Sequence, residues 1–386
     1  MAGVTFVTWT RPDTSTTLSV RHFCGQGLHA PRLAVAPADV EGDLASVGRL
    51  VCGATQPIDG AGRTVHAFEL SGLTPGADYR FVVLDGTEPV GSERRARTLP
   101  RDGRPVRIAV GGDVDIDEAT FDVAAAAAQH RPAAVLFGGD LAYENGDRAE
   151  ARRWDALLGG LDEAFSDDEG RCVPFIAAIG NHEVAPSTTP TAEHAPFWFA
   201  LFTDLLSPSA PPTYFHRRLG RDAVVVVLDS GHVSPHDGAQ AAWLERALEA
   251  HERHAFLFAL YHAPLYPSHR PFDEPLSLAG REAWGPLFSR FDVSACFENH
   301  DHVLKRTRPI RHGDVGAAGG TVFLGDGCFG AAPREPRNDE LGYLARAEGV
   351  RHSWIVDVTP RGARAFAVGA DGEVLDRVEL VPRPRR

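Results

Sequence analysis

From residue 106 onward, short apolar runs alternate with helical segments, and this alternation constrains the fold more than any other feature. Val106 to Val110 is apolar and ends in GGD at 111–113, while Ala133 to Phe137 is apolar and ends in GGD at 138–140. An Ala-rich segment from Asp117 to His130, with helical character, lies between them. Strands that alternate with helices form layered sheets with parallel strands. The sequence therefore predicts an α/β core made of strand–turn–helix units.

Further apolar runs extend this pattern toward the C-terminus. The additional predicted strands are Val173 to Ile179, Ala223 to Leu228, Ala255 to Tyr261, Val293 to Phe297 and Thr321 to Leu324, with helices near Ala149 to Phe165 and Ala239 to His251. Residues 354–381 alternate apolar and polar side chains, as antiparallel edge strands do. A linker-like stretch at 101–105, RDGRP, precedes the whole region. We therefore predict one domain over residues 105–386.

Residues 1–100 have no helical period and are predicted to form an all-β sandwich. Val4 to Trp9 alternates, and short β-rich runs recur between clusters of Gly, Pro and Asp. His66 to Val83 resembles the E–F corner of a fibronectin type III domain, with Leu73 in the core and Tyr79 as the corner tyrosine. Because only eight residues precede Trp9, we expect the natural protein to continue upstream with an opening strand and a secretion signal.

Composition limits the possible partners. The chain has 386 residues, 43% of them hydrophobic, with 39 Lys and Arg against 52 Asp and Glu, a net charge of −13. This excludes a disordered chain, and the dispersed basic residues argue against nucleic-acid binding. No apolar run is long enough to predict a membrane helix. We expect a cytoplasmic protein, or a secreted or periplasmic one if an upstream leader has been removed, and leave its oligomeric state open.

The five cysteines do not form a disulfide framework. Of these, Cys24 and Cys52 share the N-terminal region and could pair. The alternative is that all five are small buried side chains.

Side chains that can bind metals follow nearly every predicted strand of the second region. A single acidic residue after a strand is usually a helix cap, but six such positions are not explained by capping. Because the carboxyl ends of strands in open α/β sheets form binding sites, we expect these side chains to lie together. They are Asp113, Asp140, Asn181, His262, His300 and His302.

Four short motifs sharpen this prediction: GDLAY at 139–143, GNHE at 180–183, YHAP at 261–264 and NHDH at 299–302. With GDVD at 112–115 they occur in the order of the motifs GDxG, GDxxY, GNH[DE], xxH and GHxH. Residues 106–330 therefore resemble a calcineurin-like metallophosphoesterase, and in particular a purple acid phosphatase. The resemblance implies an αββα sandwich with a dinuclear metal site, preceded by a fibronectin-like domain.

The resemblance also implies how the ligands divide between two metal ions. Asp140 would bridge both ions, since a shared carboxylate offsets the repulsion between adjacent cations. Asp113, Tyr143 and His302 would complete an Fe(III) site, because a phenolate is a hard anionic donor. The remaining ligands, Asn181, His262 and His300, would bind a divalent Zn, Mn or Fe ion.

Two other histidines are assigned to the substrate by the resemblance. His182 would face the phosphate and help the leaving group, and His269 would line the substrate pocket. Glu183 is expected to orient His182 or to cap the following turn.

Two positions depart from the family pattern. Asp115 and Asn299 stand where the family has glycine. Asp115 is either a spare ligand or a solvent-facing cap, and Asn299 is expected to supply the left-handed backbone conformation itself.

The implied function is hydrolysis of phosphate monoesters of small phosphorylated substrates by metal-bound hydroxide. A phosphodiesterase or pyrophosphatase on the same core is the first alternative, and a non-catalytic adhesion or binding protein is the second. We expect residues 186–212 and 326–338 to line or cover the site.

Overall fold

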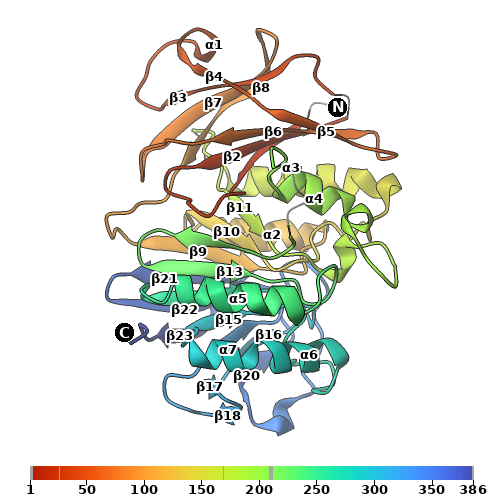
Figure 1. Cartoon of the computed structure of the whole chain (residues 1–386), viewed down its shortest axis with the longest axis vertical. Helices are drawn as coiled ribbons and strands as arrows, with labels where there is room; N and C mark the ends of the chain where they lie inside the picture. The colour runs from red at the N-terminus through yellow and green to blue at the C-terminus, as the bar shows by residue number, and fades with distance from the viewer. Residues whose placement is uncertain (1–2, 26, 168, 208–211, 385–386) are drawn as a thin grey trace.

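The computed structural model describes residues 3–25, 27–167, 169–207 and 212–384. Figure 1 shows the N-terminal strands at one end of the long axis, with helices α6 (Pro275–Ala283) and α7 (Gly285–Arg290) near the other end. Within the described residues, no helix is long and apolar enough to cross a bilayer.

The N-terminal region is a sandwich of two antiparallel sheets, as predicted. One sheet has the order β1-β2-β6-β5 and the other β4-β3-β7-β8. The hydroxyl of Tyr79 accepts a hydrogen bond from the amide of Thr74 at 2.8 Å, and Leu73 is buried. This is the geometry of a tyrosine corner. The bounds are β1 (Val4–Thr8), β2 (Leu18–Cys24), β3 (Pro31–Pro37), α1 (Leu44–Val47), β4 (Arg49–Cys52), β5 (Ala54–Ile58), β6 (Arg63–Leu70), β7 (Asp78–Asp85) and β8 (Glu88–Arg97).

The premise that this sandwich lacks its opening strand is wrong. Strand β1 pairs with β2 along its whole length, from Val4 opposite Phe23 to Thr8 opposite Ser19. Trp9 directly follows β1, and its indole nitrogen donates to the carbonyl of Thr17 at 2.8 Å. The alternating segment before the tryptophan is therefore the opening strand itself.

A disulfide between Cys24 and Cys52, one of the two alternatives, is not formed. The thiol of Cys24 is buried and lies 3.8 Å from the carbonyl oxygen of Thr64. Cys52 is exposed, carries a thiol and belongs to the other sheet. Its exposure also contradicts the alternative that all five cysteines are buried.

The second region has two facing sheets. The sheet that includes β1 continues through β11, β10, β9, β21, β22 and β23, and the other has the order β12-β13-β14-β15-β19-β16-β20. The bounds are β9 (Val106–Gly111), α2 (Glu118–Ala128), β10 (Ala134–Phe137), α3 (Ala151–Phe165), β11 (Phe175–Ala177), α4 (Pro196–Phe202), β12 (Phe215–Leu219), β13 (Ala223–Val227), α5 (Gly238–Ala250), β14 (Phe256–Leu260), β15 (Ala295–Phe297), β16 (Leu304–Thr307), β17 (Ile310–Arg311), β18 (Asp314–Val315), β19 (Val322–Gly325), β20 (Leu344–Glu348), β21 (His352–Thr359), β22 (Gly362–Gly369) and β23 (Val374–Leu380).

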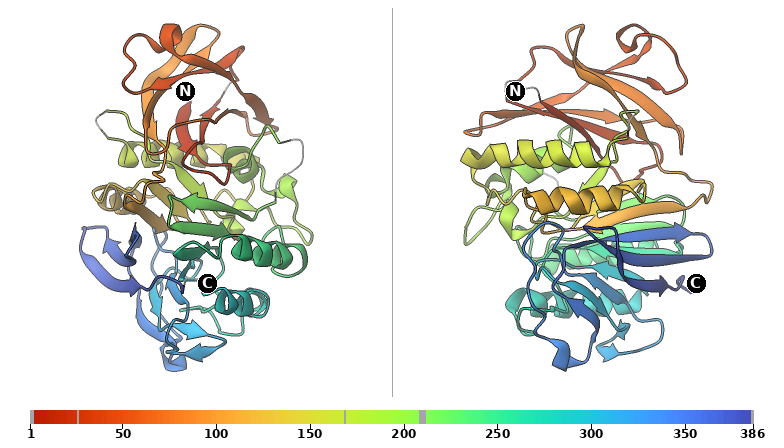
Figure 2. Two further views of the ribbon diagram at one scale, coloured as in Figure 1. Left: turned by 60° about the vertical axis from the view of Figure 1, so that its left-hand side comes forward. Right: turned by 180° about the vertical axis from the view of Figure 1, so that it is seen from behind.

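Helices cover the outer faces of both sheets, which confirms the predicted αββα layering. Helices α2, α3 and α4 pack on the first sheet, while α5, α6 and α7 pack on the second. Figure 2 shows the same layers from the side and from behind. All five residues of β13 are buried. Strands covered on both faces need continuous apolar runs, which is why these segments could be recognised from the sequence.

The two regions share a sheet across the predicted boundary. Thr8 of β1 pairs in parallel with Phe175 of β11, so that one sheet runs through both regions. The predicted linker lies in the loop between β8 and β9. The division into domains at 1–100 and 105–386 stays a prediction.

The topology places the ends of the central strands together. Strands β9, β10 and β11 are mutually parallel, as are β13, β14, β15 and β19. The polar motifs follow the carboxyl ends of these strands.

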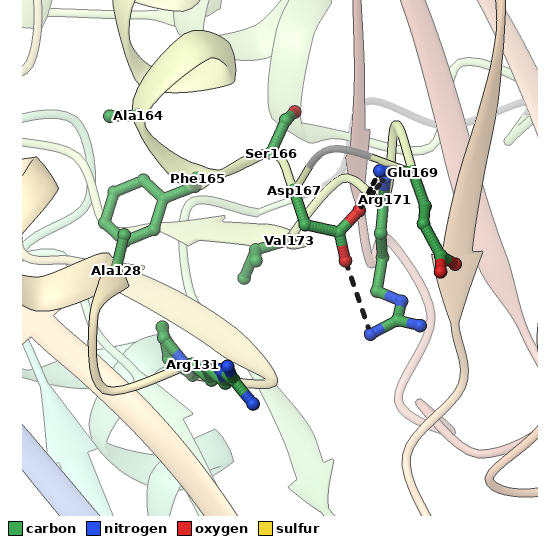
Figure 3. Close-up of a pocket in the computed structure, with 10 residues that line it drawn as sticks. Ala128, Arg131, Ala164, Phe165, Ser166, Asp167, Glu169, Arg171 and Val173 are labelled. Atoms are coloured by element: carbon green, nitrogen blue, oxygen red, sulfur yellow. Dashed lines mark hydrogen bonds and ion pairs between the residues drawn. The ribbon is translucent and has the colours of Figure 1, made fainter.

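A cavity of about 460 Å³ lies where α2 and α3 end, beside the start of β11. Figure 3 shows Asp167 contacting Arg171 on one side of this cavity, with Phe165 and Arg131 on the other.

Candidate metal centre

All seven predicted ligands follow strands β9, β10, β11, β14 and β15 and meet in two adjoining groups. In the first group, Oδ1 of Asp113 lies 3.0 Å from Nε2 of His302. The hydroxyl of Tyr143 is 3.5 Å from each of these two atoms. A carboxylate, an imidazole and a phenol therefore face one another.

The second group surrounds His262. Its Nε2 lies 3.1 Å from Oδ2 of Asp140, 3.1 Å from Oδ1 of Asn181 and 2.9 Å from Nδ1 of His300. Ligand atoms of Asp140, His262 and His300 all lie within 4.8 Å of one another. One ring nitrogen cannot donate to three neighbours, so these atoms converge without enough protons to satisfy them all.

A backbone contact joins the groups, because the amide of His300 donates to Oδ2 of Asp113 at 2.7 Å. Asp140 belongs to the second group, and its Oδ1 accepts a hydrogen bond from the backbone amide of His182 at 2.8 Å. Its role as a bridge between two ions stays a prediction.

Backbone carbonyls orient two of the imidazoles. Nδ1 of His262 lies 3.0 Å from the carbonyl oxygen of Gly138, and Nδ1 of His302 lies 3.1 Å from that of Ala332. A carbonyl can only accept, so each Nδ1 carries a proton and each Nε2 points into the site, where a cation can take the place of any proton it holds. This second hydrogen bond is typical of metal-binding histidines.

The charges of the site lack basic partners. Asp113 and Asp140 are buried, and among the described residues neither forms an ion pair with Lys or Arg. Burial alone would lower the pKa of His262, but the charges of Asp140 and Asp113 raise it to about 9. Burial, followed by the charges of Asp113 and Asp140, raises the pKa of Tyr143 well above its ordinary range. Buried carboxylates beside inward-pointing imidazole nitrogens fit cations, which would compensate all of these groups at once.

The backbone is strained where it presents the ligands. Asp113, Asp140, Tyr143 and His302 have φ values of 54°, 52°, 56° and 56°. These left-handed conformations are costly for residues other than glycine and are concentrated at functional sites.

Nearby glycines make room for the carboxylates. A Cβ on Gly327 would lie 1.9 Å from Oδ2 of Asp113, and a Cβ on Gly180 would lie 2.3 Å from Oδ1 of Asp140. Any side chain at either position would displace a predicted ligand.

Comparison with known proteins agrees with this geometry. The family model described as calcineurin-like phosphoesterase matches residues 106–304. The chain belongs to the calcineurin-like phosphoesterase family. Family membership and the cluster of Asp and His side chains together indicate a dinuclear metal site.

Two curated relatives are purple acid phosphatases of Arabidopsis thaliana. Purple acid phosphatase 23 is 25% identical over 292 residues, which cover 68% of this chain and 62% of that protein. Purple acid phosphatase 15 is 24% identical over 289 residues, covering 68% and 53%. This chain thus spans only 53–62% of the length of these relatives.

Solved structures share the fold. The purple acid phosphatase PPD1 of yellow lupin (Lupinus luteus) matches with a TM-score of 0.81 and 16% identity, covering 99% of this chain and 74% of that one. PhoD matches with a TM-score of 0.69 and 14% identity, covering 97% and 91%. Both matches include the N-terminal sandwich as well as the phosphoesterase core.

Glu183 has a different role from the two predicted ones. Its buried carboxylate accepts hydrogen bonds from the amides of Asp140, Gly180 and Leu141 at 2.8, 2.7 and 2.6 Å. Burial, reinforced by the charge of Asp140, raises its pKa to about 7. Glu183 therefore fastens the loop after β10 to the loop after β11.

His182 lies beside the two groups of ligands. Its ring stacks on Tyr143 with centroids 4.3 Å apart, and its Nδ1 lies 2.6 Å from Oδ1 of Asn145. Its Nε2 is 3.9 Å from Oδ2 of Asp140, and 35% of the side chain is exposed. The imidazole is thus close to the site and open to solvent.

His269 is placed differently. Its Nδ1 hydrogen-bonds the carbonyl of Glu335 at 2.7 Å, and its amide donates to Asp301. In the part of the chain that the structure describes, its ring has no hydrogen bond to a predicted ligand. The structure gives no direct support for its role in the substrate pocket, which stays a prediction.

The two departures from the family pattern are resolved by their contacts. Asp115 accepts from Arg153 at 2.6 Å and from the amide of Ile116, so its charge is neutralised outside the site. Asn299 does not adopt the left-handed conformation, and that expectation is wrong. The positive φ, 80°, belongs to His300, while the side chain of Asn299 donates to the carbonyl of Tyr261.

Asp301 and Arg270 contact each other beside His300 and were not identified from the sequence. Asp301 is fully buried and accepts from Arg270 at 2.7 Å. Its position between two predicted ligands was the available signal, whereas its partner lies in a distant loop.

Proposed function

We propose that this phosphoesterase hydrolyses phosphate monoesters of small molecules at a dinuclear metal centre. One observation carries the proposal. The Nε2 atoms of two backbone-anchored imidazoles face two buried carboxylates that have no Lys or Arg partner among the described residues. Such a set binds cations, and a pair of cations suits a dianionic phosphoryl group.

The donor classes support the predicted division of the ligands. Asp113, Tyr143 and His302 form the group with the phenol, which would hold Fe(III) together with Asp140. Asn181, His262 and His300 form the softer group with Asp140, which would hold Zn, Mn or Fe(II). When bound, the two ions supply positive charge and a lowered pKa for water.

The side chains then perform distinct tasks. Nδ1 of His182 donates to Asn145, so a proton taken up by this ring binds Nε2 beside the site, from where it can be given to the leaving oxygen. Stacking on Tyr143 fixes the plane of this imidazole. Glu183 keeps the two ligand-bearing loops in register through three amide hydrogen bonds.

The test is an assay of the purified chain loaded with iron and zinc, using phenyl phosphate, diphenyl phosphate and pyrophosphate. We expect two metal ions per chain and the highest kcat/KM on phenyl phosphate. Preference for the diester or for pyrophosphate would replace the monoester proposal with the corresponding alternative. Two bound ions without hydrolysis of any of the three substrates would contradict a phosphatase.

The variant His182→Ala tests the proton donor within the same assay. It should retain both metal ions and lose roughly 100-fold in rate. The loss should be larger for an alkyl phosphate than for phenyl phosphate, because the alkoxide is the poorer leaving group. Metal loss in this variant would make His182 a ligand instead.

A further inference from the structure

Two arginines from separate loops meet at the main chain of a predicted metal ligand. Nη1 of Arg270 donates to the carbonyl oxygen of His300 at 2.5 Å, and Nη1 of Arg334 donates to the same oxygen at 3.4 Å. Arg270 belongs to the loop after β14, and Arg334 to the loop after β19. Two guanidinium groups therefore lie against one carbonyl at the edge of the candidate centre.

The charges at this point do not balance. Asp301 forms an ion pair with Arg270, and its side chain is fully buried. Its second oxygen accepts the amide of His269 at 2.7 Å and that of Arg270 at 3.2 Å. Among the described residues, Arg334 has no carboxylate within ion-pair distance. The guanidinium of Arg334 is thus not paired with a carboxylate and lies beside that of Arg270, where like charges repel each other.

The surrounding loops hold both arginines in place. The amide of Arg334 donates to the carbonyl of His302 at 2.9 Å. The side-chain amide of Asn338 joins the two loops by donating to the carbonyls of Pro267 and Arg270, at 2.8 and 2.6 Å. These contacts fix the main chain of both arginines, and the bonds to the His300 carbonyl direct the two guanidiniums to one point, so the arrangement is ready to receive an anion before the anion arrives.

The site is open to solvent on this side. The Arg270 side chain is 26% exposed, and Arg334 is partly exposed. Each guanidinium has donors left after its contact with His300, and its planar fork matches the oxygens of a phosphate.

We propose that Arg270 and Arg334 bind a second phosphate group of the substrate, so that the enzyme prefers phosphate monoesters that carry another phosphate. This inference deepens the proposed function and rests on it. One phosphate would react at the metal centre, while the other would pair with the guanidiniums of Arg334 and Arg270.

The experiment compares matched substrates that differ only in the second phosphate. They are the bisphosphates and the monophosphates of ethanediol, propanediol and butanediol, assayed with the metal-loaded full chain. We expect kcat/KM to favour the bisphosphate roughly tenfold for at least one chain length, the size expected for one hydrogen-bonded charge. Arg334→Gln should abolish this preference by raising KM for the bisphosphate alone.

Two further variants make the result specific. Arg334→Lys keeps the charge and should retain part of the preference. Arg361→Gln removes one exposed positive charge from the turn between β21 and β22. This turn lies near the start of β9, whereas the candidate centre lies beyond its end, so the preference should be unchanged. Metal content is measured for every variant.

Three outcomes would overturn the inference: equal kcat/KM for both series in the wild type, an equal loss on both series in Arg334→Gln, or loss of metal from that variant. Failure to hydrolyse any member of either series would instead contradict the phosphatase function. In that case calorimetry decides the anion site separately. Methylenediphosphonate should then bind the wild type more tightly than methylphosphonate, and Arg334→Gln should remove the difference.

Discussion

Buried charge is handled in opposite ways in the N-terminal sandwich and at the candidate metal centre. In the N-terminal region, Arg21 is buried against Glu69, with an Nη1–Oε1 distance of 3.0 Å and both side chains at most 2% exposed. Its other nitrogens donate to the carbonyls of Leu201 and Thr203 at 3.3 and 2.7 Å. Each charge there has a partner, and the arginine joins the sandwich to the end of α4.

At the candidate metal centre, buried carboxylates face imidazole nitrogens instead. His262 and His302 direct their Nδ1 protons outward to carbonyls, and no Lys or Arg among the described residues pairs with Asp113 or Asp140. The contrast teaches how to separate scaffold from site. A closed ion pair holds elements together, whereas convergent acceptors require something that the chain does not supply.

Asp140→Asn should break the metal-centre side of this comparison most severely. Loss of the proposed bridge should remove both ions. It should lower kcat/KM by more than the ~10–100-fold typical of mutating a residue that only hydrogen-bonds a metal ligand. Elemental analysis and kinetics measure the two effects. The matched control is Asp115→Asn, whose carboxylate is already paired with Arg153 and which should keep both ions. An Asp140→Asn enzyme with two ions and normal turnover would remove Asp140 from the centre.

Arg21→Met should destabilise the N-terminal sandwich by removing the buried ion pair. It leaves Glu69 buried without its cation, which costs about 3–5 kcal/mol in the free energy of unfolding. Urea unfolding measures that loss, while kcat per folded molecule and metal content should stay near the wild-type values. A selective loss of metal with normal stability would mean that the ion pair serves the centre rather than the scaffold.

Removal of the metal should give the protein an unusual dependence on pH. The pKa of His262 is raised to about 9, so the stability it contributes is present below pH 6.5 and lost as pH rises to 9. The raised pKa of Glu183, about 7, also makes stability fall as pH rises from about 4.5 to 7. Both effects have the same sign.

Thermal unfolding at pH 5, 7 and 9, with and without chelator, measures this difference. The metal-free protein should become less stable as pH rises, whereas bound ions should become more stabilising because their ligands must lose protons. Parallel curves with and without chelator would show that His262 does not lie at the metal centre.

The parts of this fold that the sequence predicted depend on local pattern. The strand-ending motifs at Asp113, Asp140 and His262 mark the carboxyl ends of buried strands, and parallel strands bring those ends to one edge. Such positions follow from periodicity and topology alone. Both the layers and the meeting of six polar side chains could therefore be predicted, whereas Tyr143 was added only by the resemblance to the family motif.

What was missed depends on contacts between distant segments. Arg334 reaches His300 only because separate loops fold over the same edge, and Thr8 of the first strand pairs with Phe175. Likewise, the buried amine of Lys305 contacts Glu298 at 2.5 Å and Asp326 at 3.1 Å. A single sequence carries no signal for these partners, because side-chain type does not specify which loop it will meet.

Tyr143→Phe gives the mildest and most specific test of the metal assignment. Burial and the nearby carboxylates hold the pKa of the phenol well above its ordinary range, so without metal it stays protonated. Fe(III) would displace that proton and produce a charge-transfer band in the visible, which a divalent ion would not. The iron-loaded wild type should therefore be coloured and Tyr143→Phe colourless. Phe keeps the ring that stacks on His182, so the group around His262 should remain and activity should fall without vanishing.

A colourless wild type with full iron occupancy and high activity would exclude Tyr143 as a ligand. Asp115 could complete the site then only by giving up its ion pair with Arg153, and Arg153→Gln would favour that exchange.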